Sequence, residues 1–151
     1  MRPIRRIIVH HTASPATWRV ADIRAAHLAR GWCDIGYHEV VEADGCVFAG
    51  RPHDQVGAHC KGHNAASLGV VLVGSFESPN PPPPEVQYRA AVRRVVQLCQ
   101  EYGLAAEDVL GHRELRPTKC PGFQMHPFRG AVARELASVP VEPDYSPRPV
   151  C

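Results

Sequence analysis

The segment Gly111–Phe123, with the sequence GHRELRPTKCPGF, places a histidine and a cysteine eight residues apart, at His112 and Cys120. Two prolines and a glycine in its second half rule out a continuous helix, because proline lacks a backbone donor and clashes with the preceding turn. Imidazole nitrogen and thiolate sulfur are ligands that zinc binds in tetrahedral sites. The segment therefore predicts half of a zinc site on a loop, and the fold must bring a further ligand to it.

The segment Ile4–Thr12, IRRIIVHHT, is the best source of that ligand. Its apolar run predicts a buried strand that ends with two consecutive histidines, His10 and His11. Successive side chains of a strand point to opposite faces, so only one of the two faces the metal. A catalytic zinc site keeps three protein ligands and leaves the fourth position for water, whereas a structural site often draws on local C-x-x-C pairs. The sequence has no such pair, which favours a catalytic site.

The composition is that of one ordinary globular domain. The chain has 151 residues, 44% of them hydrophobic and 21% charged, and its formal net charge is +2. This charge is too small for the basic stripe of a nucleic-acid-binding protein. No run approaches the roughly 20 apolar residues of a spanning helix, and no signal-peptide pattern is present at the N-terminus. We therefore expect no nucleic-acid partner, no membrane insertion and synthesis in the cytosol.

Cysteine usage favours reduced thiols. If Cys120 binds metal, an odd number of cysteines remains at irregular spacings, namely Cys33, Cys46, Cys60, Cys99 and Cys151. A cytosolic protein keeps its thiols reduced, and the spacings do not suggest a disulfide framework. The pairing of Cys33 with Cys46 stays open at this point.

Hydrophobic periodicity and turn residues predict alternating helices and strands. Leu68–Ser75 is a continuous apolar run, typical of a central strand covered on both faces, and we expect the first strand beside it. Asp44 and Gly45 predict a hairpin turn. We expect strands at 4–12, 38–42, 46–49, 68–75 and 109–111, and helices from a cap at Thr17 to Gly31, at 86–102 and at 128–137. Residues 1–138 then form the domain, and 139–151 form a proline-rich tail.

Two further histidines are expected to be structural. His27 follows Val20 and Ile23 on one face of the first helix, where a packed, hydrogen-bonded histidine is commoner than a metal ligand. His38 adjoins Tyr37 at the start of a strand, so its side chain should point away from the side that Tyr37 faces.

Five motifs occur in one order along most of the chain, at 9–13, 31–38, 57–70, 111–114 and 119–123. They are VHHTA, GWCDIGYH, GAHCKGHNAASLGV, GHRE and KCPGF. Together they resemble the zinc-dependent N-acetylmuramoyl-L-alanine amidases, which include phage lysozyme-amidases and the peptidoglycan recognition proteins. The resemblance implies a single α/β domain with a mixed central β-sheet flanked by helices. It also implies a zinc site in a surface groove at one edge of that sheet.

The resemblance assigns the metal ligands and the reaction. His10, His112 and Cys120 match the three ligands of the family, which implies one Zn²⁺ per chain. The reaction is hydrolysis of the amide bond between N-acetylmuramic acid and the L-alanine of the stem peptide. Tyr37 matches a tyrosine that helps to position the water at the zinc.

One position departs from the pattern. Phage members have a lysine two residues before the cysteine ligand, and hydrolytic recognition proteins often have a threonine there. In this chain Thr118 occupies that position and Lys119 follows it. We expect Thr118 to donate a hydrogen bond to the oxyanion, with Lys119 as the alternative.

The loop at residues 57–67 is predicted to form a wall of the substrate groove. Its small and polar residues indicate a loop, and loops often hold binding residues. His59 and Asn64 are expected either to hydrogen-bond the ligand or to hold the shape of the loop. We place His11 with these two residues as a candidate for substrate contact.

Several functional alternatives share this fold. A peptidoglycan-binding module without catalysis commonly lacks a ligand, often the cysteine, whereas all three ligands are present here. Cytosolic muropeptide-recycling amidases tend to have an aspartate where this chain has Cys120. We therefore expect a phage or prophage endolysin, monomeric, which waits in the host bacterial cytoplasm and acts on peptidoglycan after membrane permeabilisation. At least one phage amidase of this type also binds and inhibits an RNA polymerase. Nothing in this sequence tests that role.

Overall fold

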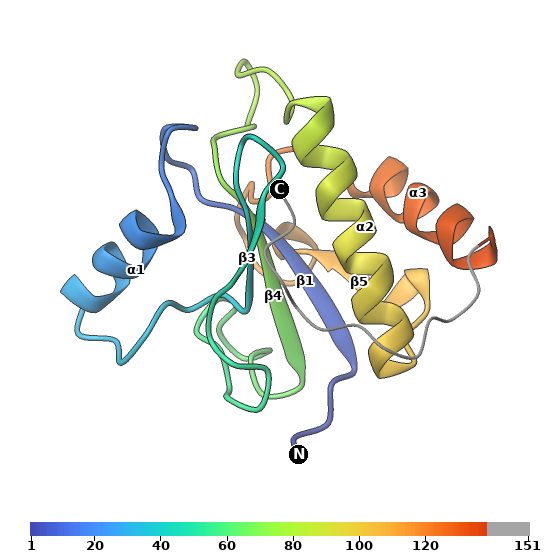
Figure 1. Cartoon of the computed structure of the whole chain (residues 1–151), viewed down its shortest axis with the longest axis horizontal. Coiled ribbons are helices and arrows are strands. Elements are labelled where there is room, and N and C mark those ends of the chain that lie inside the picture. Colours follow the sequence, from blue (N-terminus) through green and yellow to red (C-terminus); the bar gives the residue numbers. More distant parts are fainter. Residues whose placement is uncertain (139–151) are drawn as a thin grey trace.

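A five-stranded mixed sheet forms the centre of the molecule (Figure 1). The structure is a computed structural model in which residues 1–138 are described, so the predicted tail at 139–151 lies outside the described residues. The strand order is β3-β2-β4-β1-β5; only β2 and β3 pair antiparallel, and the other neighbours are parallel. The strands are β1 (Arg6–His11), β2 (Glu39–Val41), β3 (Val47–Ala49), β4 (Ser67–Leu72) and β5 (Val109–Gly111).

Helices cover both faces of the sheet. The helices α2 (Glu85–Tyr102) and α3 (Met125–Ser138) lie on one side, and α1 (Val20–Ala29) lies on the other (Figure 1). Short 3₁₀ turns, η1 (Ala106–Asp108) and η2 (His112–Glu114), flank β5. The structure thus confirms the α/β class and the mixed central sheet.

Side-chain alternation along the strands separates two apolar clusters. Leu68, Val70 and Leu72 of β4 pack in the larger cluster with α2 and α3, whereas Val71 packs in the smaller one with Ile23 of α1. All the residues of β4 are buried, which confirms that β4 is a central strand. In β1 the residues Ile7 and Val9 belong to the larger cluster, so His10, the next residue, points to the α1 side.

Several element boundaries differ from the sequence-based expectations. The N-cap of α1 is Arg19 rather than Thr17, and Asp22 Oδ2 accepts a hydrogen bond from the backbone N–H of Arg19. A carboxylate oxygen of Glu42 accepts a second one from the N–H of Val20. Helix α3 begins three residues before the predicted start, at Met125, and β4 ends at Leu72 rather than at residue 75.

The predicted turn residues lie where a positive φ is needed. Gly103, at φ +66°, ends α2 in the left-handed conformation, and its N–H donates to the carbonyl of Cys99. Gly45, at φ +87°, lies in the hairpin between β2 and β3. Both positions suit glycine because a Cβ atom makes this conformation costly.

The cysteines are only partly as expected. Cys33, Cys60, Cys99 and Cys120 are free thiols, so the pairing of Cys33 with Cys46 does not form. Cys46 is disulfide-bonded, and the expectation of a fully reduced set is therefore wrong at this position. Among the described residues, no helix combines the length and the apolar character needed to cross a membrane.

Candidate active site

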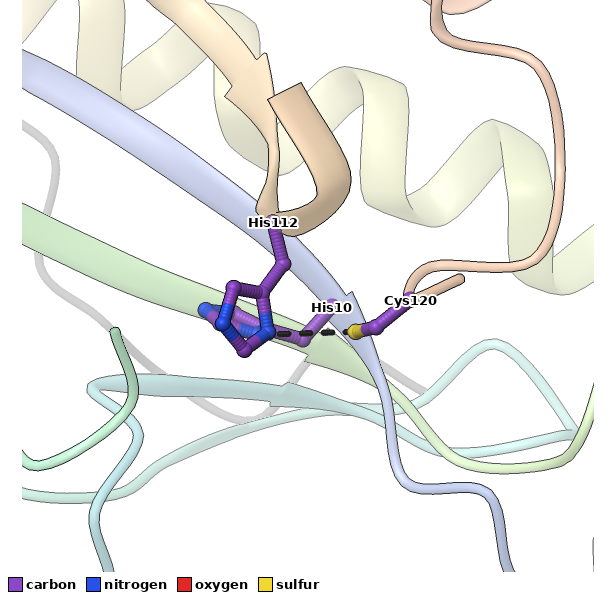
Figure 2. Close-up of side chains that lie close together, drawn as sticks. All are labelled: His10, His112 and Cys120. Carbon is purple, nitrogen blue, oxygen red and sulfur yellow. Dashed lines mark hydrogen bonds between the residues drawn. The ribbon is translucent and has the colours of Figure 1, made fainter. Parts of the chain in front are cut away.

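Strand register brings two of the predicted ligands together. Strands β1 and β5 are parallel, and Val9 lies opposite Gly111. The residues that follow, His10 and His112, therefore lie side by side at the carboxyl ends of these strands. The loop after η2 returns Cys120 to the same point (Figure 2). One ligand atom from each of the three side chains lies within 4.8 Å of the other two.

The geometry of this cluster fits zinc. The Sγ atom of Cys120 lies 3.7 Å from Nδ1 of His10. Typical Zn–S and Zn–N bond lengths at a tetrahedral angle predict a separation of about 3.5 Å between sulfur and nitrogen. Two imidazoles and one thiolate are a donor set that zinc accepts, and three protein ligands leave a fourth position open. The cluster thus has the composition and spacing of a catalytic metal site.

The surroundings of the two histidines in the cluster favour the neutral state, which is the form that binds metal. His10 is 1% exposed, and its burial lowers its pKa well below the ordinary value, with neighbouring His59 and His112 acting in the same direction. Burial also lowers the pKa of His112, and the nearby Arg116 adds to this effect. Neutral imidazole has a free lone pair on one ring nitrogen, which is the form that coordinates metal.

The thiol of Cys120 is held by the backbone around it. Its Sγ atom accepts a hydrogen bond from the backbone N–H of His11 at 3.3 Å, and its carbonyl accepts one from Arg113 at 2.8 Å. Burial raises the pKa of the thiol to about 12, although the N–H of His11 opposes this shift. Metal binding must therefore displace the thiol proton, because the thiolate is the ligand.

Tyr37 lies beside the cluster. The centroid of its ring is 5.2 Å from that of His10, and burial raises the pKa of its phenol above the ordinary value. The hydroxyl is therefore protonated and able to donate at neutral pH. Tyr37 also lines a surface hollow of about 300 Å³, together with residues that include Thr12, His27 and Arg30.

Thr118 and Lys119 differ in their surroundings. The hydroxyl oxygen of Thr118 accepts a hydrogen bond from the backbone N–H of Cys120 at 3.3 Å, which places it next to the cluster. Lys119 has a side chain that is 79% exposed, and its Nζ forms an ion pair with Glu77 at 2.9 Å. The roles predicted for Tyr37, Thr118 and Lys119 remain predictions.

The three residues predicted to contact substrate have partners within the protein. Nδ1 of His11 accepts a hydrogen bond from the backbone N–H of Phe76, on the face of β1 opposite His10. The side-chain oxygen of Asn64 accepts from the backbone N–H groups of His59 and Cys60, so it holds the shape of the loop. His59 instead lies against a member of the cluster, with its Nδ1 2.9 Å from Nε2 of His10. Substrate contact by these residues stays a prediction.

The expected structural histidines are hydrogen-bonded inside the fold. Nδ1 of His27 accepts from the backbone N–H of Gly36, as predicted for a packed histidine. Nδ1 of His38 accepts from the N–H of Gly69, and Nε2 of His38 donates to the carbonyl of Gln55.

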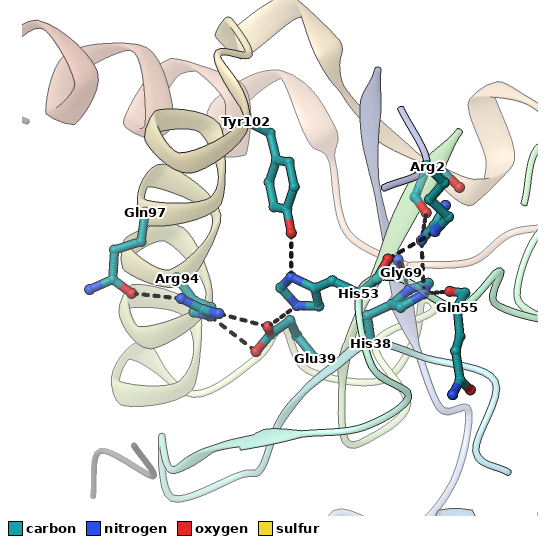
Figure 3. A network of polar contacts seen from close by, with 10 residues as sticks. Arg2, His38, Glu39, His53, Gln55, Gly69, Arg94, Gln97 and Tyr102 are labelled. Atoms are coloured by element: carbon teal, nitrogen blue, oxygen red, sulfur yellow. Dashed lines mark hydrogen bonds and ion pairs between the residues drawn. The ribbon is translucent and has the colours of Figure 1, made fainter. Parts of the chain in front are cut away.

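A polar network around β2 was not predicted (Figure 3). Arg94 of α2 forms two hydrogen bonds with the carboxylate of Glu39, and each of these side chains is less than 5% exposed. His53 donates to the same carboxylate and accepts from the hydroxyl of Tyr102. Burial alone would raise the pKa of Glu39, but hydrogen bonds from His53 and Arg94 hold it below the ordinary value. The members of this network are far apart in the sequence, so no local pattern predicts that they meet.

Comparison with known proteins identifies the family. Residues 1–123 match the family model described as N-acetylmuramoyl-L-alanine amidase. The chain belongs to this amidase family. The amidase is 38% identical over 125 residues to an endolysin of Klebsiella phage KP32. This match covers 80% of this chain and 82% of that protein. It is 36% identical over 126 residues to an endolysin of Escherichia phage T7, covering 79% of this chain and 81% of that protein.

Solved structures agree with this assignment. The amidase resembles the N-acetylmuramoyl-L-alanine amidase LysC from Clostridium intestinale URNW, with a TM-score of 0.77 and 29% sequence identity over 85% of each chain. It also resembles wild-type Drosophila PGRP-LB, with a TM-score of 0.71, 31% identity and coverage of 93% of this chain and 83% of that one. With its two histidines and one cysteine, the chain keeps an intact metal-binding triad for an enzyme of this family.

Proposed function

We propose that this amidase uses zinc to hydrolyse the amide bond between N-acetylmuramic acid and L-alanine in bacterial peptidoglycan. The observation that carries the proposal is the convergence of His10, His112 and Cys120, whose ligand atoms lie within 4.8 Å of one another. Three ligands from distant segments, with a fourth position open, suit a catalytic metal better than a structural one.

The side chains around the metal site have separate tasks in this reaction. Bound zinc supplies a Lewis acid, which polarises the scissile carbonyl and makes water more acidic. His10, His112 and Cys120 fix where that Lewis acid sits. Tyr37 keeps its phenolic proton, because burial raises its pKa, and donates a hydrogen bond that orients the reacting oxygen.

Thr118 is the proposed donor to the oxyanion. Its oxygen accepts from the N–H of Cys120, so its own hydroxyl proton remains available for donation. The charge that develops on the carbonyl oxygen during amide hydrolysis is stabilised most by donors that are already in place. Lys119 is the alternative donor, but it would have to leave its ion pair with Glu77.

The biological setting that we propose is host lysis by a phage or prophage endolysin. This proposal is supported by the endolysins of phages KP32 and T7, which match about four-fifths of the chain. We propose that the enzyme is a monomer that accumulates in the host bacterial cytoplasm and reaches peptidoglycan once the membrane is permeabilised.

The test is digestion of purified peptidoglycan, with separate assays for new alanine amino termini and new reducing sugar ends. We expect amino termini without reducing ends, loss of the product after chelation and its return with zinc. The variant Cys120→Ala is the matched control, because it removes one ligand atom and should give no product. Binding to the wall without either product, at stoichiometric zinc, would instead identify a recognition module.

A further inference from the structure

The imidazole of His10 is the first member of a chain of hydrogen bonds that leads away from the metal site. Its Nε2 lies 2.9 Å from Nδ1 of His59. Nε2 of His59 lies 3.4 Å from the hydroxyl oxygen of Ser67, a fully buried residue at the start of β4. The Ser67 hydroxyl donates to the backbone carbonyl of His63 at 2.7 Å.

The last member of this chain fixes the direction of every bond in it. A backbone carbonyl only accepts, so the single proton of the Ser67 hydroxyl points toward His63. The lone pairs of Ser67 then accept from Nε2–H of His59, which leaves Nδ1 of His59 as an acceptor. His10 must supply the remaining proton from its Nε2, and its Nδ1 is therefore unprotonated.

That nitrogen is the one that faces the metal site. Nδ1 of His10 is the atom that lies 3.7 Å from Sγ of Cys120 (Figure 2). The opposite tautomer would place a proton on Nδ1, where it would block coordination. In metal sites, the hydrogen bond at the second ring nitrogen commonly sets which tautomer of a histidine ligand is present.

We propose that His59 is a positioning residue that, with Ser67 and the carbonyl of His63, holds His10 in the tautomer that coordinates metal. This inference gives His59 a role other than the substrate contact predicted from the sequence, because both of its ring nitrogens already have partners. It rests on the proposed function in that zinc is taken as the metal.

The fold holds the ring of His59 in this orientation. The backbone N–H of His59 donates to the side-chain oxygen of Asn64 at 3.0 Å, which fixes the loop at this residue. The ring also lies against the backbone of Gly69, where an added Cβ would be only 2.6 Å from Cγ of His59. Gly69 thus provides the space that the imidazole occupies between β4 and His10.

The direct test is long-range ¹H–¹⁵N NMR of the histidine side chains in the metal-free protein. We expect both His10 and His59 to have a proton on Nε2 and none on Nδ1. Resonances are assigned by comparison with single variants of the two residues. A proton on Nδ1 of His10, or on Nδ1 of His59, would overturn the proposal. The Ser67→Ala variant removes only the hydroxyl that accepts from Nε2–H of His59. In this variant, His59 should no longer be restricted to the tautomer with its proton on Nε2.

A second test compares two substitutions of nearly equal size. His59→Asn keeps a carbonyl oxygen near the place of Nδ1, whereas His59→Leu has a similar shape and no acceptor. We expect His59→Leu to weaken zinc affinity by roughly 10- to 100-fold, measured by competition with a chromophoric chelator. We expect His59→Asn to restore most of that loss. Equal affinities for the two variants, with both folded by circular dichroism, would contradict the proposal.

Neither measurement depends on turnover. If peptidoglycan is not cleaved but the tautomers and zinc affinities behave as expected, the proposed function fails and this inference stands. If cleavage occurs while the affinities of the two His59 variants are equal, the proposed function stands and this inference fails.

Discussion

The sulfur of Cys120 lies 3.7 Å from Nδ1 of His10, although 110 positions of sequence separate the two residues. The pair connects the loop after β5 to the end of β1, so a metal bound between them links segments that are far apart in the chain. The site can form only when the sheet has already paired these strands. Metal affinity and stability of the fold are therefore coupled.

This coupling predicts that zinc stabilises the protein. A ligand that binds only the folded state at 1,000 times its Kd adds about 4 kcal/mol to the free energy of unfolding. For a domain of this size, the thermal midpoint should rise by roughly 10 °C, measured by differential scanning calorimetry. Cys120→Ala should show a much smaller rise. An equal rise in the variant would mean that zinc stabilises the protein from another place.

Substitution of Tyr37 should separate catalysis from metal binding. Tyr37→Phe keeps the ring packing beside His10 but removes the hydroxyl donor. We expect the rate of peptidoglycan cleavage to fall by on the order of 100-fold, because an oriented donor is lost. Zinc affinity and the thermal midpoint should stay close to those of the unmodified protein. Unchanged cleavage by Tyr37→Phe would show that the hydroxyl has no part in the reaction.

The oxyanion donor can be identified by three variants. Thr118→Ala should lower kcat by roughly 100- to 1,000-fold, as expected when one donor to an oxyanion is removed. Thr118→Ser retains the hydroxyl and should keep most of the activity. Lys119→Ala should have little effect, since its side chain is exposed and paired with Glu77. Full turnover by Thr118→Ala, together with loss in Lys119→Ala, would assign the role to Lys119.

His38 should make the fold less stable in acid. Burial lowers its pKa to about 4, and Nδ1 of His38 accepts from Gly69 and cannot do so when protonated. Since the unfolded pKa is about 6.5, the contribution of His38 is complete above pH 6.5 and falls between pH 6.5 and 4. Its size is about 3 kcal/mol, because each unit between the unfolded pKa of about 6.5 and the folded pKa of about 4 corresponds to about 1.4 kcal/mol. The other buried histidines with lowered pKa values should likewise decrease the free energy of unfolding as the pH falls.

The variant His38→Asn isolates this contribution. Asparagine keeps an acceptor at the place of Nδ1 and does not titrate. Denaturant unfolding from pH 7 to pH 4 should therefore show a shallower loss of stability in the variant than in the unmodified protein. Identical pH dependence in the two proteins would show that His38 does not contribute.

The buried pair of Arg94 and Glu39 should be sensitive to loss of one member. Arg94→Met removes the guanidinium from the buried carboxylate of Glu39 and leaves it the hydrogen bond from His53, and we expect a loss of about 3–5 kcal/mol in the free energy of unfolding. The double variant Glu39→Gln with Arg94→Met should be less destabilised than Arg94→Met alone. Additive losses in a double-mutant cycle would contradict coupling between the two side chains.

The fold class and the metal triad could be predicted because each rests on a local pattern. The alternation of β1 predicts that only one of His10 and His11 faces the site, and the motifs around His112 and Cys120 indicate the family. The central position of β4 follows from its uninterrupted apolar run. Glycine residues mark the turns after α2 and between β2 and β3.

The remaining features depend on contacts between distant residues. The start of α1 is fixed partly by the carboxylate of Glu42, which directly follows β2 and replaces the expected cap at Thr17. The contacts of Glu39 with its partners and of His59 with His10 join residues far apart in the chain, so they produce no periodic pattern in the sequence. Cysteine spacing likewise did not indicate the disulfide at Cys46.

The pairing of Val9 with Gly111 determines which changes in chain length the enzyme tolerates. His10 and His112 stand one residue beyond that pair, so residues added to or removed from the surface loops between the strands leave their separation unchanged. A single residue inserted within β5 would instead turn the side chain at the end of the strand to the opposite face of the sheet. Length variation among relatives of this enzyme should therefore collect in the loops and avoid β1 and β5.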